Sequence, residues 1–305
     1  MRRAPAIVLV LALAVAALVG VARASFPGRD GQLIFAARIE TDWEIYSMRA
    51  DGRGIRKLTN NRLDDSAPAW SPDGRRIAFR SERTGNPEIF SMRADGRSVK
   101  QLTRRSLPDT RPAWSPDGRR IVFQRYHEGG SDFVPLQSEI AVMNADGTHV
   151  REVARNPRQD MNPAWSPSGR TIVFRSNRDG NWELFAVRPN GTGLRRLTNN
   201  PAFDTNPSWS PNGRSIAFAS DRAEAGNFEI YVMNADGMNV RRLTNNPASD
   251  IEPTWSPSGS RIAFTSDRDG SLQIYSMAAN GQDVRRLTSR GLASRSADWQ
   301  PSRPR

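Results

Sequence analysis

Residues 67–79 read APAWSPDGRRIAF, and four close copies of this stretch follow along the chain. The copies read RPAWSPDGRRIVF at 111–123, NPAWSPSGRTIVF at 162–174, NPSWSPNGRSIAF at 206–218 and EPTWSPSGSRIAF at 252–264. With Trp299 added, the tryptophans of this motif are spaced by 44, 51, 44, 46 and 44 residues. Self-similarity at such a period indicates an array of repeated structural units.

Two further motifs keep a fixed distance from this tryptophan. A segment E/Q-[IL]-x-x-[MV] precedes a mostly Leu-Thr segment by 13 residues in all six copies, and the Leu-Thr segment precedes the next tryptophan by 12. Only the stretch from the tryptophan to the first of these motifs varies, and it is longest in the third repeat. One unit of about 44 residues is therefore repeated six times.

Each repeat predicts four short strands. P-x-W-S gives the innermost strand, R-x-I-A-F the second, E-I-Y-S-M the third and R-R-L-T the fourth, with the β-branched and aromatic residues that strands prefer. Asp-Gly and Asn-Gly pairs after the third strand supply the positive φ angles of a tight hairpin. A single unit cannot bury both faces, so radial stacking into an all-β, six-bladed β-propeller is expected.

The two ends of the chain predict how the ring closes. Residues 31–59 supply only strands two to four, and the missing inner strand is found at 295–301. Joining them removes the free edges of an open sheet. The predicted blades are 31–59 with 295–301, 65–103, 109–154, 160–198, 204–244 and 250–288, within one propeller domain at 25–305.

The first 24 residues predict an export signal. Arg2 and Arg3 precede an apolar run that ends at Ala22-Arg23-Ala24, which is typical of a signal peptide cleaved after Ala24. The alternative is an uncleaved membrane anchor, although the run is shorter than a spanning helix needs. The mature protein is expected to be periplasmic or secreted, with no membrane insertion after cleavage.

Composition excludes several kinds of site. The 305 residues include no cysteine and two histidines, so thiolate metal sites and thiol nucleophiles are excluded. The net charge of +12 comes from 44 basic and 32 acidic residues. Because the arginines recur in outer strands and turns, nucleic acid is not expected as a partner. A basic rim could bind anionic wall polymers, or it could serve solubility alone.

The repeat WSPDGRRIAF, followed by S-[DN]-R-D-G-N, EIY-x-M-N-A-D-G and RRLT, resembles the TolB-type propeller repeat, a WD-like β-propeller family. The resemblance covers residues 31 to 301 and implies a six-bladed propeller in an exported protein. TolB itself carries an N-terminal α/β domain before its propeller, and the resemblance here does not include that domain. The family also leaves room for a channel cation such as calcium, although no cofactor is expected.

A row of aspartates stands five residues before the tryptophan in five of the six repeats. Either they ring the channel mouth and hold a cation or basic partner, or each pairs within its own blade. The base four residues after the strand-two Phe is present in the same five repeats, and in the first repeat Ser294 and Ile39 replace acid and base together. This favours a structural clasp. The expected pairs are Asp65–Arg83, Asp109–His127, Asp160–Arg178, Asp204–Arg222 and Asp250–Arg268.

The residues three before each tryptophan do not repeat. They are Ala67, Arg111, Asn162, Asn206, Glu252 and Ser296. Positions with a purely structural role should repeat, so these are predicted specificity residues at the channel mouth, with a solvated loop as the alternative. The longer segment Tyr126 to Val134 lies on the same face, where Phe133 is either a partner contact or part of a disordered loop.

Catalysis is not expected. The chain has no G-x-S-x-G motif, and its S-x-R-D-G loops lack the spacing of a calcium loop. We therefore predict a binding protein whose partner is an envelope protein or a peptide segment of one. The alternative is a binder of anionic cell-wall polymers or other carbohydrates, and a polysaccharide lyase is the least favoured interpretation.

Overall fold

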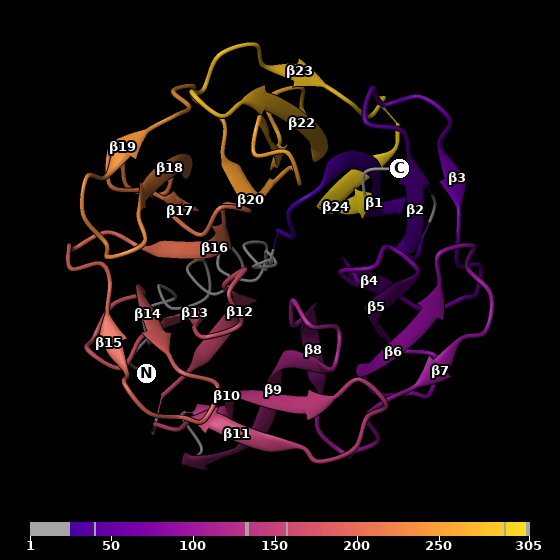
Figure 1. Cartoon of the computed structure of the whole chain (residues 1–305), viewed down its shortest axis with the longest axis vertical. Helices are drawn as coiled ribbons and strands as arrows, with labels where there is room; N and C mark the ends of the chain where they lie inside the picture. Colours follow the sequence, from indigo (N-terminus) through magenta and orange to yellow (C-terminus); the bar gives the residue numbers. More distant parts are fainter. Residues whose placement is uncertain (1–24, 40, 132–133, 157, 290, 303–305) are drawn as a thin grey trace, which may run out of the picture.

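The computed structural model describes residues 25–39, 41–131, 134–156, 158–289 and 291–302, which form a ring of six antiparallel sheets around a central axis (Figure 1). Each sheet has four strands, and one strand of each lies next to the axis. The predicted six-bladed β-propeller is confirmed. In the described part of the chain, no helix is long and apolar enough to cross a membrane.

The strands follow the repeat from the axis outward. The first blade holds β24 (Ala293–Ser302), β1 (Arg29–Arg38), β2 (Glu44–Met48) and β3 (Arg56–Lys57). The second holds β4 (Asp65–Trp70), β5 (Arg76–Ser81), β6 (Glu88–Arg93) and β7 (Lys100–Gln101). The third holds β8 (Asp109–Trp114), β9 (Arg120–Ser131), β10 (Val134–Asn144) and β11 (Arg151–Ala154).

The remaining three blades repeat the same order. The fourth holds β12 (Asp160–Trp165), β13 (Ile172–Ser176), β14 (Glu183–Val187) and β15 (Arg195–Arg196). The fifth holds β16 (Asp204–Trp209), β17 (Ser215–Ser220), β18 (Glu229–Asn234) and β19 (Arg241–Arg242). The sixth holds β20 (Asp250–Trp255), β21 (Arg261–Ser266), β22 (Gln273–Ala278) and β23 (Arg285–Arg286).

The last strand closes the ring beside the first one, as predicted. β24 pairs antiparallel with β1, with Trp299 opposite Leu33. The segment before β1 joins this seam to the sixth blade, because the Ser25 hydroxyl donates to the carbonyl of Trp255 at 2.7 Å. Residues from both ends of the chain therefore hold the first and sixth blades together.

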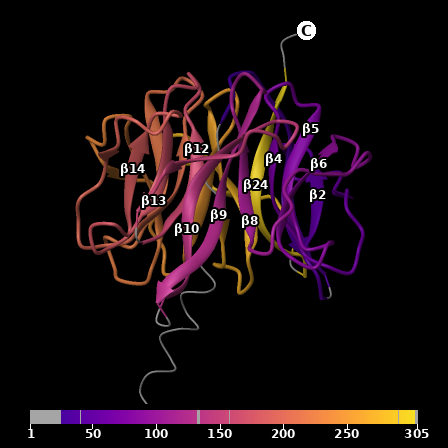
Figure 2. The ribbon, with the colours of Figure 1, turned by 90° about the horizontal axis from the view of Figure 1, so that it is seen from below.

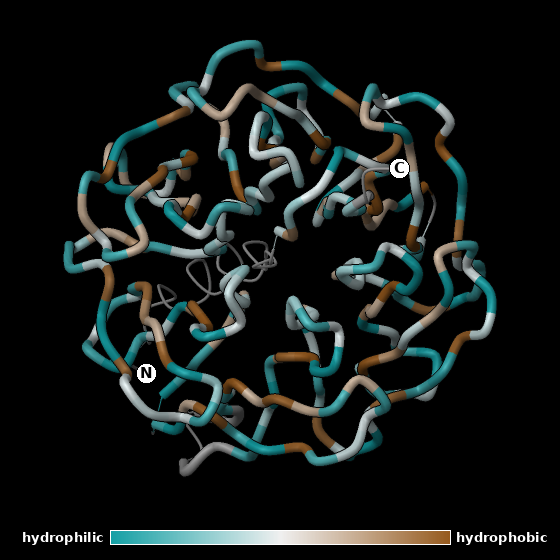
Figure 3. Tube along the Cα trace, viewed as in Figure 1, coloured by the Kyte–Doolittle hydropathy of each residue, from teal (hydrophilic) through white to brown (hydrophobic). Residues whose placement is uncertain are grey.

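The repeated tryptophan packs against the preceding blade. Trp165 is fully buried in a cluster with Ile121 and Phe123 of the third blade. Trp209 packs in the same way with Leu184 of the fourth blade. The apolar strands lie inside the ring and the outer turns are mostly hydrophilic (Figure 3). Apolar burial between blades is thus the main source of stability.

The glycine of the Asp-Gly turn has a second role besides its backbone conformation. Gly237 has a φ of 96°, and a Cβ added there would lie 2.3 Å from the carbonyl oxygen of Leu197 in the preceding blade. Only glycine allows both the turn and this close approach. The outer strands are therefore held close together by turns as well as by the core.

The third blade is larger than the others. β9 and β10 have 12 and 11 residues, against five or six in the matching strands of the second, fourth, fifth and sixth blades. They extend past the lower edge of the ring as a paired hairpin (Figure 2). The predicted contact residue Phe133 lies outside the described residues. The described residues of the longer third-repeat segment extend strands β9 and β10.

Candidate functional site

The predicted aspartate–arginine clasp is confirmed in four blades. The closest nitrogen–oxygen distances are 2.7 Å for Arg83–Asp65, 2.8 Å for Arg178–Asp160, 2.9 Å for Arg222–Asp204 and 2.7 Å for Arg268–Asp250. Each arginine also lies over the strand-two Phe, as Arg178 does over Phe174 with its guanidinium carbon 5.5 Å from the ring centre. The clasp thus joins the inner strand to the aromatic core of the same blade.

The clasp aspartates have no exposed surface. Burial raises the pKa of Asp160, Asp204 and Asp250, and the paired arginine opposes that rise. A buried carboxylate without its cation would be strongly destabilising. A partner on this face would therefore contact other groups, and the role of the aspartates is to hold the inner strand within its blade.

The predicted Asp109–His127 pair is wrong. Asp109 instead accepts hydrogen bonds from Arg125 at 2.8 and 3.0 Å. Nη1 of Arg105 also lies 3.6 Å from a carboxylate oxygen of Asp109. His127 lies 2.9 Å from Glu152. The missed signal is one residue: Arg125 stands where the other clasp blades have a serine. Because Arg125 lies directly opposite Asp109 in the β8–β9 register, it replaces the base that His127 no longer provides.

The six positions three before the tryptophan share an unusual backbone conformation. They have positive φ angles of 52° at Ala67, 56° at Arg111, 57° at Asn162, 53° at Asn206, 56° at Glu252 and 58° at Ser296. All six side chains are buried, so the solvated-loop alternative is wrong. The second to sixth inner strands shift register at this point. Such a bulge redirects one side chain.

Positively charged side chains from four blades gather near the axis. The pKa of Arg111 is lowered to about 10, mainly by burial. The positive charges of Arg295 and Arg80 contribute to this lowering, and Tyr126 and Glu252 oppose it. Burial also lowers the pKa of Arg175 to about 9, with Arg111 as the next cause. Arg111 and Arg295 lie on the inner strands β8 and β24. Arg80 and Arg175 donate to the hydroxyls of Ser66 and Thr205, which also belong to inner strands. We call Arg80, Arg111, Arg175 and Arg295 the axial arginines.

Aromatic and polar groups fix part of this cluster. The guanidinium of Arg175 lies 4.3 Å from the ring centre of Trp182, and that of Arg295 lies 4.0 Å from Trp43. Arg111 is only 5% exposed, and its Nη1 has no hydrogen-bond partner in the described part of the structure. The same holds for Nε of Arg175. A buried guanidinium nitrogen without an acceptor favours an anionic ligand.

Glu252 and Asn206, which occupy the same repeat position as Arg111, have different environments. Glu252 accepts hydrogen bonds from Thr265 at 2.7 Å and from the backbone of Ser296 at 2.6 Å. It therefore ties the sixth blade to the first. Neither amide atom of Asn206 has a hydrogen-bond partner among the described residues. Asn206 is thus the second polar group here that can accept a ligand.

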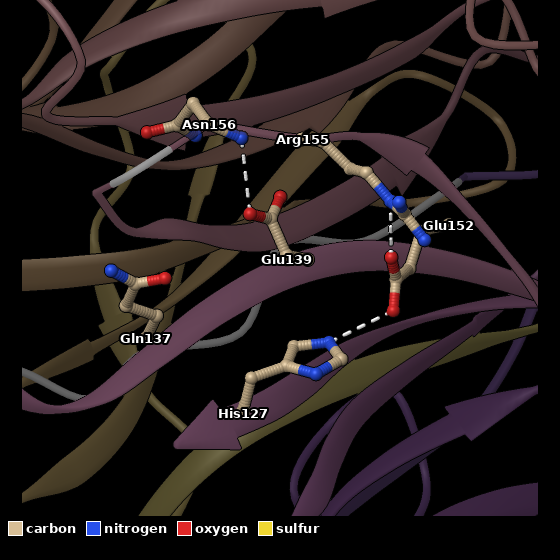
Figure 4. A pocket seen from close by; sticks show the side chains of 6 residues that line it. All are labelled: His127, Gln137, Glu139, Glu152, Arg155 and Asn156. Atoms are coloured by element: carbon tan, nitrogen blue, oxygen red, sulfur yellow. Dashed lines mark hydrogen bonds and ion pairs between the residues drawn. The ribbon is translucent and has the colours of Figure 1, made fainter. Parts of the chain in front are cut away.

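A separate pocket lies in the third blade (Figure 4). Its lining residues are His127, Gln137, Glu139, Glu152, Arg155 and Asn156. Glu152 contacts His127 at 2.9 Å and Arg155 at 2.5 Å, and Glu139 accepts from the backbone of Asn156 at 3.0 Å. Sequence reasoning missed Glu139 and Glu152, although Glu152 is the only acid at its position in the six repeats.

Burial raises the pKa of Glu139 to about 8. The hydrogen bond from Asn156 and the charge of Arg178 lower it, whereas Asp160 and Glu152 raise it. Glu139 is 6% exposed, and its Oε2 has no hydrogen-bond partner within the described residues. Across the described ranges, no group of three or more His, Cys, Asp or Glu side chains is placed to hold a metal ion.

The fold and this axial cluster define a class of protein, a six-bladed propeller of WD-like repeats with a basic centre. The TolB beta propeller domain model matches residues 13–137, 130–225 and 223–304. The chain therefore belongs to the TolB propeller family.

Curated relatives share part of this chain. A protein TolB homolog of Chlorobium luteolum is 35% identical over 155 residues, which are 51% of this chain and 34% of the relative. The Tol-Pal system protein TolB of Bordetella pertussis is 33% identical over 159 residues, which are 50% of this chain and 35% of the relative. The matched region thus spans about a third of the length of these relatives.

Solved structures show the same fold. The TolB crystal structure from Acinetobacter baumannii has a TM-score of 0.79 at 21% identity, covering 91% of this chain and 68% of that one. An oligogalacturonate lyase in complex with manganese has a TM-score of 0.60 at 14% identity, covering 88% and 80%. Both likenesses concern the fold alone.

Proposed function

We propose that this chain is an exported, non-catalytic binding protein that receives an acidic segment of an envelope protein at the axial arginines. The observation that carries the proposal is the buried Arg111, whose Nη1 has no acceptor and which faces further positive charges from other blades. A carboxylate inserted there would supply the missing acceptor and offset the repulsion between the guanidinium groups.

The kind of partner follows from the family and the leader. The Bordetella pertussis relative is a Tol-Pal system protein, which supports an envelope protein as the partner. The leader sequence supports export. The arrangement of the site supports binding, because Nη1 of Arg111 has no acceptor among the described residues and Glu252 is already engaged in hydrogen bonds, whereas Arg80 is paired with Glu82.

Site-directed cross-linking tests this proposal. A photoreactive p-azidophenylalanine in place of Met161, whose sulfur accepts from Arg175 at 3.0 Å, reports on what lies near the axis. We expect cross-links to an acidic segment of an envelope protein, and we expect Arg111→Gln to weaken binding of the corresponding synthetic peptide at least tenfold. Arg285→Gln on the exposed rim is the matched control and should leave binding unchanged.

Two results would contradict the proposal. If Arg285→Gln weakens binding as much as Arg111→Gln, the rim holds the partner. If the bound material is an anionic polysaccharide that dissociates fully at high salt, the protein is a wall-polymer binder that uses long-range charge.

A further inference from the structure

The pocket of the third blade corresponds to a position that the first, fourth and fifth blades fill with their own cationic side chain. In the fourth blade, Arg196 contacts Glu183 at 2.8 Å, and in the fifth, Arg242 contacts Glu229 at 2.6 Å. In the first blade, Lys57 lies 3.4 Å from Glu44. These acids occupy the repeat position of Glu139. The fold therefore shows three times what kind of group such a carboxylate takes.

The third blade has lost two of the side-chain partners that this carboxylate has in the fourth blade. The residue equivalent to Arg196 is Glu152, so a positive charge is replaced by a negative one. The residue equivalent to Thr198, whose hydroxyl donates to Glu183, is Ala154. A buried acid that loses a cation and a hydroxyl donor together is left with an unmet need for hydrogen bonds.

We propose that this pocket binds the guanidinium or ammonium group of a basic side chain from a partner protein. The incoming group would take the place that Arg196 and Arg242 hold in their own blades, with Oε2 of Glu139 as its main acceptor and Glu152 as the second acid. The unpartnered Oε2 on a side chain that is 6% exposed is the observation that points to a ligand.

The groups around the pocket agree with this assignment. Arg155 has a side chain that is 79% exposed and contacts Glu152, so it leaves Glu139 without a cation of its own. His127, on the other side, also contacts Glu152 (Figure 4). The raised pKa of Glu139 agrees with this, because burial disfavours the charged form and the charge of Arg178 offsets only part of that effect.

The proposal extends the proposed function by one contact, and it can be tested without the partner. N-acetyl-arginine amide is the probe, and N-acetyl-citrulline amide, which has the same shape without the charge, is its control. We expect the arginine probe to shift the backbone amide NMR signals of Asn156 and Glu139 in a saturable way, and the citrulline probe to cause no such shift.

Variants decide whether Glu139 is the acceptor. Glu139→Gln should weaken probe binding at least fivefold. The double variant Glu152→Arg/Ala154→Thr restores the residues of the fourth blade and should abolish binding, because an internal guanidinium then fills the pocket. Glu224→Gln removes an equal charge at an exposed position of the fifth blade and should have no effect.

Three results would overturn the proposal: equal shifts from citrulline, undiminished binding in the double variant, or no shift at the pocket. Loss of probe binding with intact cross-linking at Met161 would refute this pocket alone. Saturable probe binding without any cross-link at Met161 would refute the proposed function and leave the pocket proposal intact.

Discussion

The third and fourth blades are built from the same repeat, yet they satisfy their buried charges differently. In the fourth blade, Asp160 pairs with Arg178 and Glu183 pairs with Arg196, so each acid has an internal base. In the third blade, Asp109 pairs with Arg125, whereas Oε2 of Glu139 has no hydrogen-bond partner among the described residues. The strand-two Phe is buried in both blades, but Phe123 lies opposite Ala141 in the third blade, whereas Phe174 lies opposite Phe185 in the fourth. The comparison shows that a repeat can change its buried ion pairs while its inner tryptophan and its strand-two Phe stay buried.

The largest expected effect comes from removing a buried tryptophan. It tests whether the contact between the third and fourth blades is packed as tightly as the next contact along the ring. Trp165→Ala, at the contact of the third and fourth blades, should lower the free energy of unfolding by about 3–5 kcal/mol. Trp209→Ala, one blade further on, should cost a similar amount because both indoles are buried against the preceding blade. Chemical denaturation measures both. A Trp165 variant that loses less than half as much as the Trp209 variant would show that the third blade is packed more loosely.

The next effect tests the changed clasp at equivalent positions. Arg178→Ala should cost about 3 kcal/mol, because it leaves Asp160 buried without a cation. His127→Ala should cost less than about 1 kcal/mol, because Asp109 keeps Arg125. Unfolding of the two variants under the same conditions gives the comparison. Equal losses would mean that His127 supports the blade in a way that the contact with Glu152 does not explain.

A pH series sharpens the comparison of the two buried glutamates. The folded-state pKa of Glu139 is raised to about 8, so the proton it binds stabilises the fold most at low pH. That contribution is lost as the pH rises from 4.5, the ordinary value, through 8, because the buried carboxylate is charged above its folded-state pKa. Glu139→Gln should therefore raise stability above pH 8 by about 1–3 kcal/mol. It should change stability little below pH 4.

Unfolding between pH 4 and 9 measures this effect. Glu183→Gln is the matched control, and above pH 8 it should lower stability, since it removes an acid that is paired with Arg196. A Glu139→Gln variant that is less stable than the parent at pH 9 would contradict the comparison.

The sequence predicted the ring because its period places the same apolar residues in every blade. Residues 295–301 predicted the seam for the same reason, since only the first repeat lacked an inner strand. The clasp was predicted wherever Arg follows the strand-two Phe by four residues. It failed at Asp109, because Arg125 and His127 together replace a serine and an arginine, and a single aligned position cannot show an exchange between two.

Arg111 was predicted as a channel-mouth residue, but the other three axial arginines could not be predicted from the repeat. Arg80 and Arg175 belong to second strands, whereas Arg111 and Arg295 belong to inner strands at two different repeat positions. No column of the repeat contains all four. They meet only because the ring brings different blades to one axis, and this convergence depends on side-chain direction, which the period does not encode. The burial of the Arg111 side chain could not be predicted from the sequence for the same reason.

Each inner strand has one residue with a positive φ angle, three before its tryptophan, and this affects how such a protein can diversify. Alanine, arginine, asparagine, glutamate and serine all adopt this backbone angle here. The geometry of the bulge is thus independent of which residue occupies it. New ligand preferences could therefore arise one blade at a time, by single substitutions facing the centre, while the scaffold keeps its shape.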